Sequence, residues 1–130
     1  MTTLDAIVAG VNPPRQFGRI DSRYIVRAVT GGGSHFFDRP TMRFFDSRVA
    51  HTGWQIIDPA GWDHQYIVVT SERFDSHSPR LYTVRLFTMT DHGRRVHHAD
   101  DVRGFQGYGS ARAAGRAADL WARELAAGVA

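Results

Sequence analysis

Arginine and aromatic side chains supply the first candidate chemistry in this sequence. The chain has 130 residues, and all sixteen of its basic residues are arginines. They alternate with aromatic residues in two segments, Met42–Phe45 and Tyr82–Phe87. A guanidinium group pairs with phosphate oxygens through a planar fork, and an aromatic ring stacks on bases. The pattern therefore indicates a candidate nucleic-acid-binding set, which comprises Arg43, Arg48, Arg85, Arg112 and Arg116.

A simpler explanation competes with this one. Aromatic residues between arginines also pack in a core while the arginine side chains extend to solvent. A GC-rich genome favours arginine codons and accounts for the missing lysines without any function. The formal net charge of +3 is mild and does not by itself indicate nucleic acid. Both explanations stay open at this point.

Seven histidines raise the question of a metal site. The densest group is His97 and His98, followed by Asp100 and Asp101. Neighbouring residues of a strand point to opposite faces, so His97 and His98 cannot easily bind one ion. The other histidines recur beside aspartates in segments with turn composition. We therefore predict no metal ligands, and the cluster remains an alternative hypothesis.

One short segment combines glycines, a serine and a histidine. Ser34 and His35 follow Gly31–Gly33, whose N–H groups could hold an anion. The segment has neither the lysine of a P-loop nor the glycine spacing of a dinucleotide-binding loop, so a flexible linker explains it more simply. No other local context signals a nucleophile with its base. We predict no catalytic residue and no cofactor.

The composition narrows the class of protein. The sequence contains no cysteine, which excludes disulfides, thiolate zinc sites and cysteine nucleophiles. Residues 1–10 have no basic flank, and no apolar run is long enough for a secretory signal or a membrane span. We expect a cytoplasmic protein of the bacterial host cell with no membrane partner. The length and a hydrophobic fraction of 42% are typical of one globular domain.

The first third of the chain combines helix breakers with strand formers. A proline pair stops any early helix, so residues 1–23 are expected to form an N-terminal arm and residues 24–130 one domain. Tyr24–Val29 is rich in strand formers and is followed by a glycine run, which predicts a short strand. Within residues 35–48, the potential cap Asp38 and phenylalanines at helical spacing predict a short Phe-rich helix.

Strand signals dominate the middle of the chain. The connections are rich in Asp, Pro, Gly and Ser, which predicts hairpin loops and an antiparallel meander of three or four strands. The second strand contains Tyr66–Val69, which is apolar on both faces, so this strand is expected in the centre. In the third strand apolar residues alternate with Thr83 and Arg85, which predicts one buried and one wetter face. The expected strands, with a short edge strand last, are Val49–Ile57, Gln65–Phe74, Leu81–Met89 and Arg94–His98.

The chain closes with an amphipathic helix. Ser110 is a good N-cap for a helix over Ala111–Ala127, and Gly128 follows where a C-cap glycine is typical. The apolar side is expected to carry Ala113, Ala117, Leu120, Trp121, Glu124 and Leu125. The charged side is expected to carry Arg112, Arg116, Asp119 and Arg123. The sequence thus predicts an α+β fold with this helix packed on the sheet.

The predicted order of elements has a resemblance among known folds. The order helix, strand, strand, strand, helix resembles the double-stranded RNA-binding domain, and Gly107–Ser110 is similar to the start of that family's last helix. The basic cluster of that family is reduced here to Arg112 and Arg116, and a long segment separates the third strand from the helix. The resemblance implies an analogy of architecture.

The second resemblance is to small uncharacterised proteins of phages and mobile elements of GC-rich bacteria. It rests on the motifs HFF-x3-TMRFF-x-SR from His35, YIVVTSE from Tyr66 and YTVR from Tyr82, and it spans residues 35 to about 120. That group has no assigned activity. The resemblance implies a setting and a fold but no mechanism.

Three functional hypotheses follow. The first is a non-catalytic accessory protein of a phage or mobile element that binds a macromolecule, either a host protein or another copy of itself. The second is a nucleic-acid-binding module that uses the five arginines. The third is an unrecognised enzyme that uses Ser34 with His35, or the His97–Asp101 segment with a metal. Convergence of the arginines on one face would separate the first two.

Overall fold

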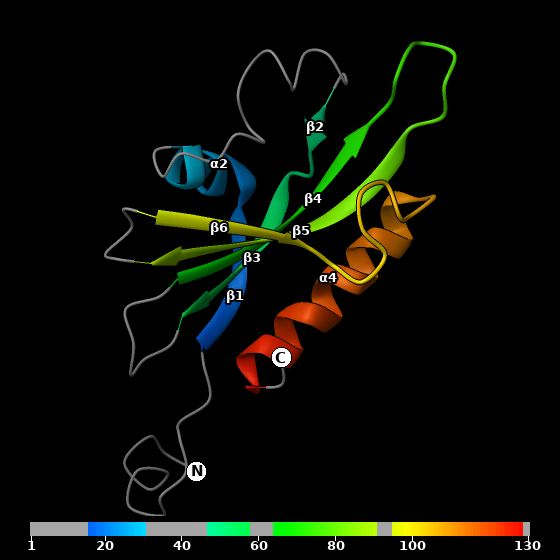
Figure 1. Cartoon of the computed structure of the whole chain (residues 1–130). Coiled ribbons are helices and arrows are strands. Elements are labelled where there is room, and N and C mark those ends of the chain that lie inside the picture. Colours follow the sequence, from blue (N-terminus) through cyan, green and yellow to red (C-terminus); the bar gives the residue numbers. More distant parts are fainter. Residues whose placement is uncertain (1–15, 31–46, 58–63, 91–94, 129–130) are drawn as a thin grey trace, which may run out of the picture.

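An antiparallel sheet with a helix on each face forms the structure (Figure 1). The computed structural model describes residues 16–30, 47–57, 64–90 and 95–128. In chain order the elements are β1 (Gln16–Asp21), α2 (Ser22–Thr30), β2 (Arg48–Val49), β3 (Thr52–Ile57), β4 (His64–Glu72), β5 (Leu81–Thr90), β6 (Arg95–Asp100) and α4 (Ala111–Ala126). The predicted α+β class is confirmed.

Four consecutive strands form the meander that the sequence predicts. β3, β4, β5 and β6 lie side by side in chain order, and each neighbouring pair is antiparallel. β4 is central, as predicted, and its residues Ile67 and Val68 are fully buried. β1 extends the sheet beside β3, and the short strand β2 pairs with the C-terminal half of β4. The sheet therefore has six strands.

A bend separates β2 from β3. Val49 pairs with Thr70 and Trp54 pairs with Ile67, so the four residues 50–53 face only two residues of β4. This insertion interrupts the ladder as a wide bulge does. A Cβ atom on Gly53 would lie 2.5 Å from the Ile67 carbonyl oxygen, so the glycine permits the close approach.

Helices α2 and α4 cover opposite faces of the sheet. Ile67 of β4 packs with α4, whereas its neighbours Tyr66 and Val68 pack with Ile25 and Val29 of α2. Successive strand residues point to opposite faces, so these contacts place α2 on one side and α4 on the other. Figure 1 shows the sheet between them. We call the two sides the α2 face and the α4 face.

α4 begins and ends as the sequence predicts. The Ser110 hydroxyl accepts a hydrogen bond from the Ala113 N–H, and Gly128 has a φ of +81° just after the helix. The buried side is rotated from the predicted one, because Leu120 is 59% exposed and Ala113 is also exposed. The residues buried against the sheet are instead Ala114, Ala118, Ala122, Leu125 and Ala126. Small side chains allow the helix to lie close to the strands.

The predicted strand over Tyr24–Val29 is wrong, because these residues belong to helix α2. The Asp21 carboxylate accepts the Arg23 N–H at 2.8 Å and caps the first turn. Ile25 and Val29 then stand four residues apart on one side of the helix and are fully buried. The β-branched residues of this segment favour a strand, and so short a run has no periodicity that would reveal a helix, so composition misled the prediction.

The structure tests only some of the remaining predictions for the N-terminal part of the chain. β1 falls within the range expected to be an arm, and residues 1–15 of that range lie outside the described residues. The Phe-rich helix within residues 35–48 also lies outside them, up to residue 46, and Arg48 begins β2. Ser34 and His35 lie outside them as well.

Candidate binding sites on the two faces of the sheet

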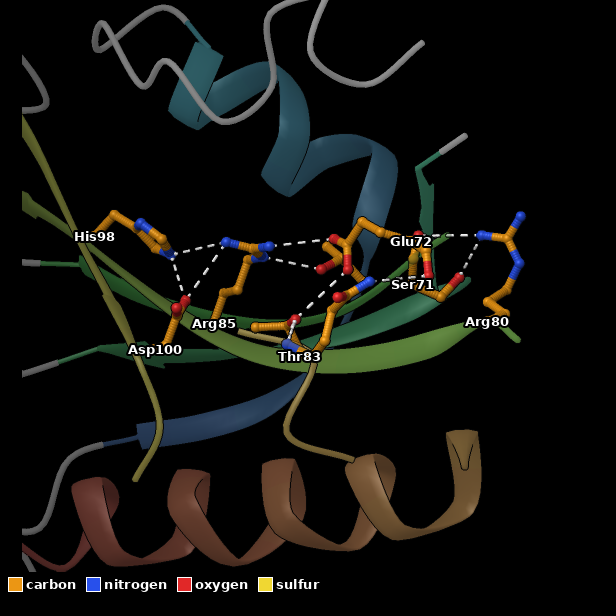
Figure 2. Close-up of polar contacts among 9 residues, drawn as sticks. Ser71, Glu72, Arg80, Thr83, Arg85, His98 and Asp100 are labelled. Carbon is orange, nitrogen blue, oxygen red and sulfur yellow. Dashed lines mark hydrogen bonds and ion pairs between the residues drawn. The ribbon is translucent and has the colours of Figure 1, made fainter. Parts of the chain in front are cut away.

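A network of buried polar side chains lies on the α2 face (Figure 2). The Arg85 guanidinium donates to Glu72 at 3.1 Å and to Asp100 at 3.4 Å, and its Nε–H donates to the Thr70 hydroxyl at 2.8 Å. The side chains of Arg85 and Glu72 are only 3% and 0% exposed. Desolvating both charges is costly, so the pair needs hydrogen bonds on both partners.

The sheet register brings this network together. Arg85 stands between Val68 on β4 and Asp100 on β6. Glu72 lies four residues after Val68 and points to the same face. The expectation that this face of β5 is wetter is therefore wrong, because Thr83 and Arg85 are 0% and 2% exposed. Burial lowers the pKa of the Arg85 guanidinium, while the charges of Glu72 and Asp100 oppose that shift.

The loop before α4 is attached to the same network. The Gln106 N–H donates to the Thr83 hydroxyl at 2.8 Å, and the Gln106 side chain donates to the Glu72 carbonyl at 3.3 Å. Gln106 holds a φ of 57°, in the left-handed region. The Phe105 ring lies 5.6 Å from the Arg85 guanidinium carbon. The network thus fixes the chain that leads into α4.

His98 occupies the β6 side of the network. Its Nε2 atom lies 2.9 Å from the Asp100 carboxylate, and its ring stacks on Phe87 at 5.1 Å between centroids. Burial lowers the pKa of His98, the charge of Asp100 raises it, and the charge of Arg85 lowers it. A protonated His98 is therefore disfavoured in the folded protein.

The His97–Asp101 segment separates as strand geometry predicts. The His97 ring lies beside Thr90, while the Tyr108 hydroxyl donates to the Asp101 carboxylate. Within the described parts of the chain, no group of three or more His, Cys, Asp or Glu side chains could hold a metal ion.

An open cavity of about 350 Å³ lies on the α4 face, between the N-terminal half of α4 and the bend from β2 to β3. The bend borders this space, and its residues Ala50, Thr52 and Gly53 line it. The walls that matter for chemistry combine cationic, aromatic, acidic and small residues, namely Arg19, Arg48, Trp54, Tyr82, Gly115 and Asp119.

One edge of the cavity is held by polar contacts. The Trp54 indole N–H donates to Asp119 at 2.7 Å, and Arg19 lies 3.7 Å from the same carboxylate. The Arg19 guanidinium carbon also lies 5.0 Å from the centre of the Trp54 ring. These contacts join α4 to β3 and β1.

Three of the five arginines in the candidate set lie on the α4 side of the sheet. Arg48 pairs with Ser71, whose neighbour Val69 packs with the α4 core, so Arg48 points to the α4 face. Arg112 and Arg116 are exposed on α4 and directly follow Ala111 and Gly115, which line the cavity.

Of the other two arginines of the set, one lies elsewhere and one is not described. Arg85 lies in the buried network on the α2 face, and Arg43 lies outside the described residues. A fourth arginine lies on the α4 side, because Arg19 pairs with Trp54 in the sheet and lines the cavity. We define the α4 flank as Arg19, Arg48, Arg112, Arg116 and the cavity beside them.

Sequence reasoning missed Arg19, because β1 is mostly polar and carries no alternation that predicts a strand. Gly115 carried a usable signal, since a glycine inside an alanine-rich helix weakens it. The partnership of Trp54 with Asp119 had no signal, because 65 residues separate the two in the chain.

Comparison with known proteins supplies a family. The chain matches a family of unknown function, DUF7447, over residues 23–119. The matched range includes β2 to β6 and reaches Asp119 of α4, so it contains the buried network and most of the α4 flank. No curated protein and no solved structure matches the chain.

Two further findings bear on the expectations from sequence. Among the residues the structure describes, no helix is long and apolar enough to cross a membrane. The helix that opens the double-stranded RNA-binding analogy lies outside the described residues, and beyond it the described elements include a further strand, β6, before α4. Because the family match spans most of the length of this chain, the chain belongs to the DUF7447 family of unknown function.

Proposed function

We propose that this protein is a non-catalytic binding module that holds a nucleic acid on the α4 flank. One observation carries the proposal: Arg19 of β1 and Arg48 of β2 line the cavity beside α4, and the same helix carries the exposed Arg112 and Arg116. Guanidinium groups pair readily with phosphate oxygens, and a nucleic-acid backbone presents a row of phosphates. The resemblance to small proteins of phages and mobile elements makes such an element the proposed setting.

The charges of the flank support this assignment. Arg48, Arg112 and Arg116 form no ion pair with any residue that the structure describes, and Arg19 is partly neutralised by Asp119. Each phosphate that such a side chain neutralises releases condensed counterions, so affinity falls steeply with salt. Contacts of this type position a strand without reading its sequence.

A salt series tests the proposal. Binding of labelled single-stranded DNA, single-stranded RNA and duplexes of each would be measured by fluorescence anisotropy at increasing salt. The double variant R112Q/R116Q is expected to bind more weakly and to reduce the salt slope by about two. The matched control is R27Q/R95Q, which removes two exposed arginines of α2 and β6. Equal slopes in the two variants, or no binding at low salt, would reject the proposal.

A protein partner remains a second candidate, because β6 ends the strand order of the sheet. No further strand pairs with the outer edge of β6 within the described parts of the chain. Such an edge can accept a strand from a host protein or from another copy of this chain. Sedimentation over a concentration series would show a dimer if copies pair there. A monomer at every concentration would leave only the host-protein form of this candidate.

A further inference from the structure

Gly115 is the unusual feature of the cavity on the α4 flank. It stands inside the helix Ala111–Ala126, where glycine is less favourable than alanine by about 1 kcal/mol. Packing does not require this glycine, because a Cβ atom there would meet nothing within 4 Å. Its conformation does not require it either, since it lies in a regular helix. Gly115 lines the cavity, and because it has no side chain it adds no atoms that would fill this space.

The volume limits what the cavity can hold. About 350 Å³ lies at the small end of the range of roughly 300–1,000 Å³ that is typical of ligand sites. The space therefore suits a single small unit and not several stacked ones. A macromolecule on the α4 flank could place only one of its units there.

The walls indicate which unit fits. Arg48 supplies a cationic side chain at the cavity with no ion-pair partner in the described residues, which suits a phosphate. Trp54 and Tyr82 supply aromatic walls for a flat ring. Asp119 supplies a carboxylate that can accept a hydrogen bond from a ring or exocyclic N–H group.

We propose that this cavity binds one nucleotide, with its phosphate at Arg48 and its base against Trp54 and Tyr82. The inference rests on the proposed function, because the nucleotide is taken to be one unit of the strand on the α4 flank. It goes further by assigning a pocket for a base, which arginine contacts alone do not provide. The end of a nucleic-acid strand, or an unstacked base within one, could enter this pocket, since each presents a base that is free of stacked neighbours.

The test uses a substitution that fills the cavity without harming the helix. Gly115→Gln replaces the glycine with a better helix former, and Ala113→Gln is the control on the exposed opposite side of the same helix. The probes are the four ribonucleoside 5′-monophosphates and inorganic phosphate, followed by chemical-shift titration of the full chain. Circular dichroism confirms that both variants fold.

The expected result is that monophosphates bind to the wild type and the A113Q variant and at least about tenfold more weakly to the G115Q variant. Inorganic phosphate should bind more weakly than any monophosphate. The proposal is overturned if G115Q and A113Q bind monophosphates equally, or if phosphate competes as well as the nucleotides do. If oligonucleotides still bind with a salt slope that R112Q/R116Q reduces, only the pocket fails and the proposed function survives. If monophosphates bind and oligonucleotides do not, the proposed function fails instead.

Discussion

The two faces of the sheet bury their residues in different ways. On the α4 face, alanines of the helix meet Ile56, Ile67 and Val84, and an open cavity remains beside them. On the α2 face, an apolar cluster under α2 continues into the network of Arg85 and Glu72. One face therefore keeps its arginines at the surface, where they can meet a ligand, and the other neutralises an arginine inside. The same residue type serves opposite purposes on the two faces.

The largest expected effect comes from breaking the buried pair. Arg85→Met leaves the Glu72 carboxylate buried without its main cation, and we expect a loss of about 3–5 kcal/mol in the free energy of unfolding. The double variant Arg85→Met with Glu72→Leu should recover most of that loss. Urea denaturation measures both, and Arg95→Met on the exposed edge strand is the control. If Arg85→Met cost no more than the control, the network would not stabilise the α2 face.

The next largest loss of stability is expected where α2 packs closely against Gly53. Gly53→Ala would place a Cβ atom 2.7 Å from Ile25 Cδ1 and closer still to the Ile67 carbonyl. Overpacking of this kind costs about 1–3 kcal/mol, because backbone and helix must shift. Gly18→Ala in β1 meets nothing within 4 Å and serves as the control. A Gly53→Ala protein as stable as this control would show that α2 packs less tightly than the structure indicates.

A smaller effect of opposite sign is expected on the α4 face. Gly115→Ala should stabilise the protein by about 1 kcal/mol, since it removes a helix-weakening residue where a methyl group has room. Thermal unfolding by circular dichroism would detect the rise in midpoint. A loss of stability would mean that packing needs Gly115, and the glycine would then no longer point to a cavity that is kept open for a ligand.

The smallest effect is a dependence of stability on pH through His98. Burial lowers the pKa of His98 below its ordinary 6.5 in the folded protein, so the unfolded chain takes up a proton first as the pH falls. The contribution of His98 is therefore complete above pH 6.5 and is lost as the pH falls toward the folded value. Urea denaturation at about pH 7.5 and about pH 5.5 should show a smaller loss for His98→Phe than for the wild type. The exposed His97→Phe protein should behave as the wild type does, and an equal loss in all three would contradict the assignment.

Local signals in the sequence predicted much of this fold. Alternation and turn residues predicted β3 to β6, and Ser110 with Gly128 marked the ends of α4. They failed where tertiary contacts decide. The segment of α2 reads as a strand until its burial against Tyr66 and Val68 is known, and β1 becomes a strand only because β3 offers it an edge.

The candidate sites were harder to predict than the fold. Arg85 looked like a surface arginine because nothing near it in the chain reveals that Glu72 and Asp100 flank it in the sheet. The α4 flank depends on register, since Arg19 and Arg48 reach the α4 face only through their pairing with Trp54 and Ser71. Pairings between residues distant in the chain carry no signal in a single sequence.

The central claim is that the α4 flank binds nucleic acid while the α2 face is structural. Chemical shifts of backbone amides, followed as a short single-stranded oligonucleotide is added, test it most directly. We predict that the perturbed amides lie in residues 48–54 and 111–119, and that those of α2 and β6 stay unchanged. Perturbation confined to α2 or β6, with the amides around Arg48 and Arg112 unmoved, would contradict the claim.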